Sequence, residues 1–141
     1  MGKKAPISAE VASSKTPVSV QPARNEMIRF RFGEVDDKHW PLKKISTDHH
    51  ERLLKRLAYF ETLTVADAIA NKLLADYDMS QCPNKTAKKI LAQREDPTDA
   101  LCRLTIGPSG SLRLHGIRVA NEFHVLWWDP KHEVWPDKNV R

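Results

Sequence analysis

Alternating apolar and polar positions mark both ends of the folded part of this chain, with helical spacing between them. From 27 to 32, apolar residues alternate with Arg29 and Arg31. This period of two predicts a strand with its apolar side chains on one face and both arginines on the other. Gly33 and the acidic residues after it end the strand.

Helical spacing of apolar residues occupies the middle of the chain and predicts three helices. The first is expected over 48–61 and the second from 64 to about 76, each preceded by capping residues. The third is expected over 86–94 and is stopped by the Asp96-Pro97 pair. The apolar positions of the three helices are Leu53, Leu54, Leu57, Phe60, Ala68, Ile69, Leu73, Leu74, Ala87, Ile90 and Leu91.

The end of the chain returns to alternation and predicts a three-stranded antiparallel meander. Strands are expected over 101–106, 112–119 and 123–128. A Gly-Pro-Ser-Gly turn at 107–110 separates the first two, and a turn at 120–122 separates the last two.

The middle strand of the meander, 112–119, changes phase half-way along. Strict alternation would move its apolar residues from one face to the other. One extra residue at Gly116 restores a single apolar face. The sequence therefore predicts a β-bulge at Gly116 that turns Arg118 to the same side as Arg113 and His115.

The order of these elements predicts one α+β domain over residues 26–141. We expect an N-terminal strand, two to three helices and the C-terminal meander, forming one sheet packed on the helices. A length of 141 residues suits one hydrophobic core. Residues 1–25 hold three prolines and no aromatic residue, which predicts a disordered basic arm.

Composition sets the broad class of the protein. Hydrophobic residues make up 40% of the chain and charged residues 29%, which is typical of a globular domain. The apolar run 123–128 is far shorter than the roughly 20 residues of a membrane-spanning helix, and no apolar segment follows Lys3 and Lys4 to make a secretory signal. Cys82 and Cys102 are isolated and suit a reducing compartment. We expect a cytoplasmic protein that does not enter a membrane.

A formal charge of +5 and a pI of about 9.3 favour an anionic partner. Much of this excess belongs to the N-terminal arm, whose charged residues are Lys3, Lys4, Lys15, Arg24 and Glu10. The chain shows no zinc-ligand spacing, glycine-rich phosphate loop or nucleophile motif. We therefore expect neither a metal nor a cofactor.

Polar residues of the meander gather on one face of the predicted sheet. Arg113, His115 and Arg118 share this face, with His124 and Trp128 as expected neighbours. Arginines hold phosphates, histidines exchange protons near neutral pH, and a tryptophan can stack on a base. The combination suits single-stranded RNA, which can be cleaved without a metal when its 2′-oxygen attacks the adjacent phosphorus. The other interpretation is the ordinary solvated face of an antiparallel sheet.

The closing segment, residues 112–136, resembles the end of the RelE/ParE toxin superfamily of bacterial toxin–antitoxin systems. Its sequence runs LRLHGIRVANEFHVLWWDPKHEVWP. Arg118 stands where the RelE-like pattern has an arginine in its penultimate strand, and a hydrophobic last strand and a His-containing cluster follow. The resemblance covers about 27–136, with its specific part in 112–136. Trp135 stands where many members have a tyrosine, and an indole cannot exchange a proton.

The resemblance implies a RelE-like fold and an mRNA endonuclease that works on the ribosome and is neutralised by an antitoxin. By position it assigns phosphate binding and transition-state stabilisation to Arg118 and Arg113, and proton transfer to His132 with Glu133 or His124. The residues expected to contact RNA are Arg103, Arg113, His115, Trp128 and Lys131.

Two functional hypotheses follow from the sequence. The first is a RelE-like toxin that cleaves mRNA or blocks translation, with mRNA or the ribosome and a cognate antitoxin as partners. The second is a non-catalytic module that uses the basic sheet face to bind nucleic acid or an acidic protein. The superfamily includes inactive relatives and gyrase inhibitors, and a fold alone does not decide between such functions.

Overall fold

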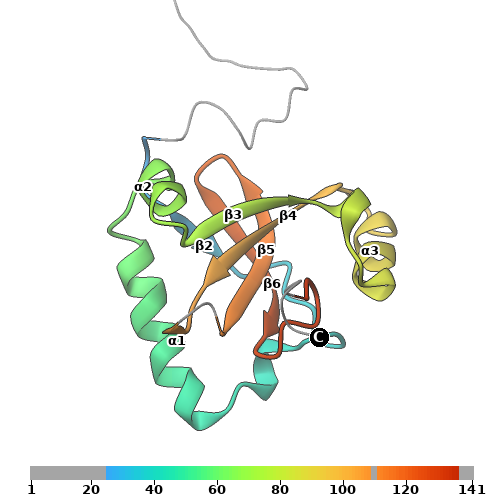
Figure 1. The fold of residues 1–141 in the computed structure, drawn as a ribbon, viewed down its shortest axis with the longest axis horizontal. Helices are drawn as coiled ribbons and strands as arrows, with labels where there is room; N and C mark the ends of the chain where they lie inside the picture. The colour runs from blue at the N-terminus through green and yellow to red at the C-terminus, as the bar shows by residue number, and fades with distance from the viewer. Residues whose placement is uncertain (1–24, 109–110, 137–141) are drawn as a thin grey trace, which may run out of the picture.

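The computed structural model describes residues 25–108 and 111–136, whose strands form one mixed five-stranded sheet (Figure 1). The strands are β2 (Arg29–Arg31), β3 (Leu74–Asp78), β4 (Ala100–Thr105), β5 (Arg113–Val119) and β6 (Glu122–Asp129). Their order across the sheet is β2-β6-β5-β4-β3. All neighbours are antiparallel except β2, which pairs in parallel with β6. The predicted α+β arrangement, with the first strand in one sheet with the C-terminal meander, is confirmed.

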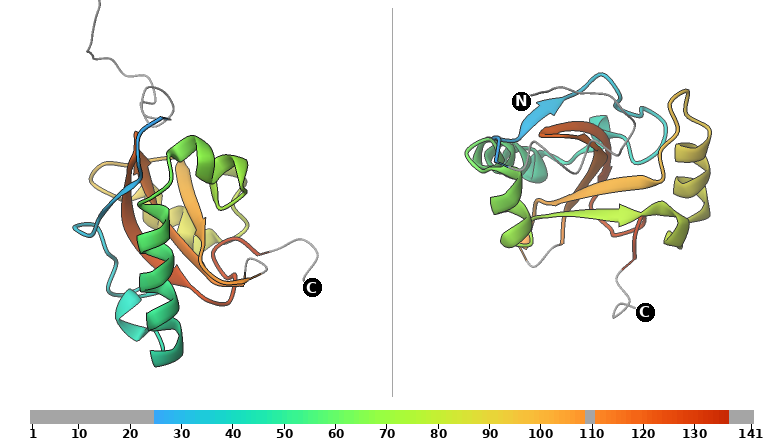
Figure 2. Two further views of the ribbon diagram at one scale, coloured as in Figure 1. Left: turned by 90° about the vertical axis from the view of Figure 1, so that its left-hand side faces the viewer. Right: turned by 90° about the horizontal axis from the view of Figure 1, so that it is seen from above.

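Helices cover the two faces of this sheet. They are α1 (Thr47–Phe60), α2 (Val65–Ala70) and α3 (Lys85–Ala92), with short 3₁₀ turns at η2 (Leu42–Lys44) and η3 (Met79–Gln81). The three α-helices begin at side-chain caps, which are Ser46, Thr64 and Asn84. Figures 1 and 2 show α1 and α2 at one side of the sheet and α3 at the opposite side. No described helix is long and apolar enough to cross a membrane.

The second helix is shorter than predicted, because a strand replaces its second half. The amide of Leu73 donates to the carbonyl of Ala68 at 2.9 Å, and that of Lys72 donates to Ile69 at 3.0 Å. These are the two bonds of a Schellman motif, with Lys72 at φ 62° in the position that usually holds glycine. A lysine gives no stop signal in the sequence. Beyond it, β3 pairs with β4 from Leu74 onward.

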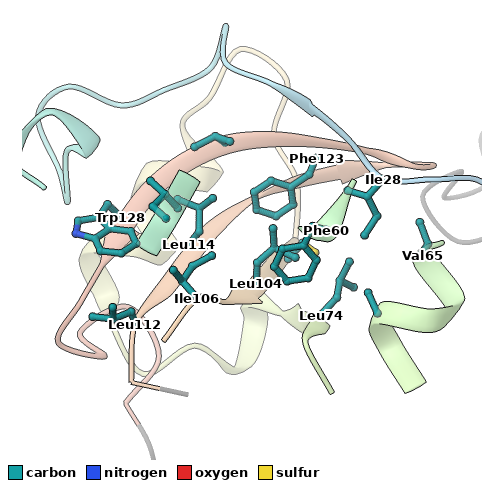
Figure 3. Close-up of a cluster of buried hydrophobic side chains, with 14 residues drawn as sticks. Ile28, Phe60, Val65, Leu74, Leu104, Ile106, Leu112, Leu114, Phe123 and Trp128 are labelled. Carbon is teal, nitrogen blue, oxygen red and sulfur yellow. The ribbon is translucent and has the colours of Figure 1, made fainter. Parts of the chain in front are cut away.

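Two hydrophobic clusters lie on the two faces of the sheet. The larger one, on the face covered by α1 and α2, includes Phe60, Val65, Leu104 and Phe123 (Figure 3). The smaller one lies on the face covered by η3 and α3 and consists of Met79, Cys82, Ala87, Leu91, Leu101, Leu126, Trp127 and Val134. Both faces of the sheet are therefore buried over much of their area.

The predicted bulge exists at Gly116, but its extra residue lies in the neighbouring strand. Across β5 and β6, His115 pairs with Trp127 while Gly116 pairs with Val125, so that Leu126 is the additional residue. The pairing of β5 with β4 continues without a shift. Consequently β5 alternates strictly, and the expectation that the bulge turns Arg118 to the side of His115 is wrong.

The predicted disordered arm over 1–25 lies outside the described residues except for Asn25. The single-domain prediction for 26–141 stays a prediction. What the structure does describe is one sheet to which every named strand belongs.

The bulge generates a prediction about Gly116. A Cβ atom added there would lie 2.8 Å from ring atoms of Phe123 and closer still to the carbonyl oxygen of His124. We expect Gly116→Ala to lower the free energy of unfolding by about 1–3 kcal/mol, the usual cost of overpacking a core. The measurement is urea denaturation followed by circular dichroism.

Gly33→Ala is the matched control, because nothing lies within 4 Å of a Cβ at Gly33. It should stay within about 0.5 kcal/mol of the wild type. Equal stability of the two variants would show that β6 does not approach Gly116 as closely as described.

Candidate functional site

Two arginines and a histidine lie together on the α3 side of the sheet. His115 in β5 pairs with Arg103 in β4, and the neighbouring pair is Arg113 with Thr105. Alternation therefore directs Arg103, Arg113 and His115 to one face. The two arginines are diagonal neighbours on the adjacent strands β4 and β5. We call these three residues the Arg–His cluster.

Both arginines of the cluster are half-buried and already bonded within the protein. Arg113 Nη1 donates to the carbonyl oxygen of Trp135 at 3.0 Å. Arg103 Nη1 donates to the hydroxyl of Thr105, and its guanidinium lies 5.8 Å from the ring centroid of Tyr77. The Arg103 Nε is buried and has no partner in the described part of the chain. Arg103 thus keeps a donor that an anion could use.

The histidine of the cluster is fully buried and paired with a buried carboxylate. His115 Nε2 lies 3.3 Å from Asp129 Oδ2, and the side chains of both residues are 0% exposed. A carboxylate accepts, so this contact assigns the proton of a neutral imidazole to Nε2. His115 Nδ1 then carries a lone pair, and it has no partner among the described residues.

Burial and hydrogen bonding shift the pKa values of this pair in definite directions. Burial lowers the pKa of His115 below its usual 6.5, and the bond to Asp129 offsets only part of the effect. Burial would raise the pKa of Asp129, but hydrogen bonds from His115 and from two backbone amides outweigh it and leave the pKa lowered. The pair is therefore a neutral imidazole beside an ionised carboxylate at pH 7.

The segment after β6, residues 130–136, is bonded to Asp129, the partner of the histidine, and we call it the C-terminal strap. Asp129 holds the strap, because Oδ1 accepts from the amide of Glu133 and Oδ2 from the amide of Val134, each at 2.9 Å. Val134 is fully buried in the α3-side cluster. Trp135 stacks on Tyr77, with ring centroids 4.6 Å apart and planes at 32°.

Arg118 lies on the opposite face of the sheet from the Arg–His cluster, which corrects the sequence-based expectation. Its Nη2 donates to Asp76 Oδ2 at 2.6 Å, and its Nη1 donates to the carbonyl of Ala120 at 2.8 Å. The side chain is only 4% exposed. Because strict alternation along β5 separates it from His115, Arg118 is not next to the residues with which it was expected to bind a phosphate.

Trp128 and His124 are also away from the cluster. Trp128 was expected on the wetter face, but it is 4% exposed and belongs to the α1-side core with Leu112 and Leu114 (Figure 3). The extra residue Leu126 changes the phase of β6 and turns this indole inward. His124 lies near the other end of β6, where its Nε2 is 3.4 Å from Glu122 Oε1.

The remaining predicted residues belong to the C-terminal strap. Lys131 is exposed. His132 Nε2 lies 3.1 Å from the carbonyl oxygen of Ser111, beside the connection between β4 and β5. Glu133 accepts from the indole of Trp40 at 3.0 Å. These three residues follow the end of β6, whereas His124 lies near its start. The expected proton-transfer pairing of His132 with His124 is therefore not brought together.

Sequence reasoning missed Asp129, Tyr77 and Trp135 as members of this site. Asp129 directly follows the last predicted strand, 123–128, and no role was expected for it. Tyr77 fell in the loop after the predicted second helix, and Trp135 was noted only as a residue that cannot transfer protons. The sequence offered one signal for Asp129, which is its position at the end of the apolar run 123–128. A carboxylate next to a buried strand must find hydrogen-bond partners inside the protein.

The chain matches no family model, no curated protein and no solved structure. Among the described residues, no group of three or more His, Cys, Asp or Glu side chains could hold a metal ion.

The buried histidine generates a prediction about pH. The folded state holds His115 with a lowered pKa, so the unfolded chain binds the extra proton more readily below about pH 6.5. This contribution to stability is complete above that pH and is lost as the pH falls towards the folded-state value. We expect the free energy of unfolding to decrease from pH 7.5 to 5 less steeply in His115→Gln than in wild type. The measurement is urea denaturation across this pH range.

His50→Gln serves as the control, since His50 is an exposed residue of α1. Its pH profile should follow the wild type. A His115→Gln profile parallel to the wild type would mean that His115 is not buried as a neutral group.

Proposed function

We propose that this protein acts on single-stranded RNA as a RelE-like toxin, and that the Arg–His cluster is the surface that holds the RNA. The observation that supports this most is the placement of Arg103 and Arg113 on one face, diagonal to each other and each next to His115. Two guanidinium forks at this spacing suit successive phosphates of a nucleic-acid backbone. The closing sequence, with its resemblance to that superfamily, supports the toxin class.

Cleavage is the sharper form of this proposal, and the His115–Asp129 pair favours it. His115 Nδ1 would accept the proton of the 2′-hydroxyl as the 2′-oxygen attacks phosphorus. The bond from phosphorus to the 5′-oxygen then breaks, with His132 as the proposed donor of a proton to the leaving oxygen. Arg103 and Arg113 would stabilise the charge on the non-bridging oxygens. Because the His115 side chain is 0% exposed, this reaction requires neighbouring residues to move, and the strap bonded to Asp129 is the segment we propose to move.

The second candidate is a non-catalytic RNA-binding protein, and the burial of His115 favours it. Its side chain is 0% exposed, so it contacts no ligand in the described conformation. Both arginines can meet phosphates without strap movement, because they are only half-buried. Proposed partners in either form are mRNA or the ribosome, with an antitoxin protein as the regulator.

The arginines generate a prediction about RNA affinity. We expect Arg103→Gln and Arg113→Gln each to weaken binding of a short oligoribonucleotide about 10- to 100-fold, because each removes a charge-assisted contact. The slope of log affinity against log salt should fall by about 0.7 for each arginine removed. Fluorescence anisotropy at several salt concentrations measures both quantities.

Arg29→Gln controls for the loss of one positive charge, because Arg29 is an exposed residue of β2 at the far edge of the sheet. It should bind nearly as tightly as the wild type. Equal weakening by all three variants would mean that the RNA follows general charge and not the cluster.

Expression in cells separates cleavage from binding. Wild type is expected to arrest growth and to produce new mRNA 5′ ends, and His115→Gln should abolish the new ends while still binding RNA in vitro. Arrest with intact mRNA would support the non-catalytic form. Normal growth together with no RNA affinity of the purified protein would contradict both forms of the proposal.

A further inference from the structure

A hollow of about 460 Å³ lies beside the edge strand β3, next to the Arg–His cluster. Its lining comes from the end of α2, from β3 and from β4, and consists of Ile69, Lys72, Leu74, Ala75, Asp76 and Arg103. Arg103 therefore belongs both to the cluster and to the hollow. Aliphatic side chains and two cationic groups together suit a ligand with an apolar part and an anionic part.

The only carboxylate in the lining of this hollow, that of Asp76, is already neutralised. Asp76 Oδ2 accepts from Arg118 Nη2 at 2.6 Å, and Oδ1 lies 3.4 Å from Arg118 Nε. The bond is the fork of a guanidinium on a carboxylate. The charges of Lys72 and Arg103 are thus left for a ligand, which favours an anion.

Lys72 occupies a backbone position that does not itself call for lysine. Its φ of 62° is the left-handed conformation that glycine adopts without strain. The helix end would form more easily with glycine there. The Lys72 side chain is exposed and lines the hollow, so its charge is accessible to an anion bound there.

An aromatic pair lies on the α3-side face of β3, next to the part of the hollow that Ala75 and Arg103 line. Tyr77 follows Ala75 by two residues and so shares its face. The Arg103 guanidinium lies 5.8 Å from the Tyr77 ring centroid, and Trp135 stacks on the same tyrosine with centroids 4.6 Å apart. Tyr77 and Trp135 are both only half-buried.

We propose that Tyr77 and Trp135 form a stacking platform for one base of the bound RNA, and that Lys72 and Arg103 hold the phosphate of the same nucleotide in the hollow. This inference rests on the proposed function and extends it to four residues, of which Arg103 alone was expected to contact RNA. Stacking on an aromatic platform contributes about 1–3 kcal/mol per base and tolerates every base. The subsite therefore selects single-stranded RNA without selecting a sequence.

An oligouridylate and an abasic oligonucleotide of the same length separate stacking from charge. We expect Tyr77→Leu and Trp135→Leu each to weaken binding of the oligouridylate about 5- to 100-fold. Their affinity for the abasic oligonucleotide should match that of the wild type. Lys72→Gln should weaken both ligands, because a phosphate is common to them. Tyr77→Phe keeps the ring and should bind like wild type.

Tyr59→Leu is the matched control, since Tyr59 is an exposed tyrosine of α1 with the Arg56 guanidinium 5.7 Å from its ring centroid. It presents the same chemistry elsewhere on the protein and should bind both ligands normally. Tryptophan fluorescence gives a second readout that does not depend on a destabilised variant. Oligouridylate should quench it in wild type, the abasic ligand should not, and Trp135→Phe should lose most of the quenching.

Three outcomes would overturn the platform. Unchanged oligouridylate affinity in Tyr77→Leu and Trp135→Leu would show that no base stacks there. Equal weakening of both ligands by these variants would show that the aromatic pair only supports the fold. Failure of wild type to bind either oligonucleotide would contradict the proposed function itself, and the platform with it.

Discussion

The extra residue at Leu126 is the constraint on which the rest of the site depends. In β6, strict alternation would place Asp129 on the same face as Phe123 and Val125, inside the α1-side core. An unpaired carboxylate buried there would cost several kcal/mol. The bulge instead places Trp127 beside Leu126 on the α3 side and turns Trp128 to the α1 side. Asp129 consequently reaches the α3 side, where His115 and two strap amides satisfy it.

Asp129 in turn links the burial of the histidine to the position of the strap. One carboxylate accepts from His115, from Glu133 and from Val134. Movement of the strap away from the sheet would therefore break two of the three bonds to the residue that pairs with His115. Arg113 and Tyr77 add contacts to Trp135 at the far end of the strap. The position of the strap and the hydrogen bonding of His115 are therefore linked through Asp129.

Local patterns in the sequence predicted most of the elements, except β3 and the end of α2, but they did not predict which face of the sheet each side chain takes. The alternation of the meander, the cap at Ser46 and the apolar spacing of α3 all predicted elements that the structure contains. The end of α2 was missed because Lys72 takes a glycine position, and β3 exists because β4 offers it a partner. Arg113 and His115 were placed together correctly, whereas Arg118 and Trp128 were misplaced. The face that Arg118 and Trp128 take depends on whether β5 or β6 carries the extra residue. The pairing between the two strands determines this, and the sequence of one strand alone does not.

The same geometry separates RNA binding from RNA cleavage in physical terms. In the proposed function, binding would use Arg103, Arg113 and the aromatic pair, all of which are half-buried and keep surface for a ligand. Cleavage would need His115, whose Nδ1 is buried without a partner among the described residues. An unsatisfied nitrogen in the interior carries a desolvation cost, and that cost is removed when the strap opens and a hydroxyl reaches the imidazole. An RNA that binds better when the strap is open would contact the arginines and would also supply a hydrogen-bond partner to His115 Nδ1. Its binding free energy would therefore include relief of the desolvation cost at that nitrogen. Affinity at the cluster and reactivity at His115 would then be coupled through the strap, with Asp129 as the residue that they share.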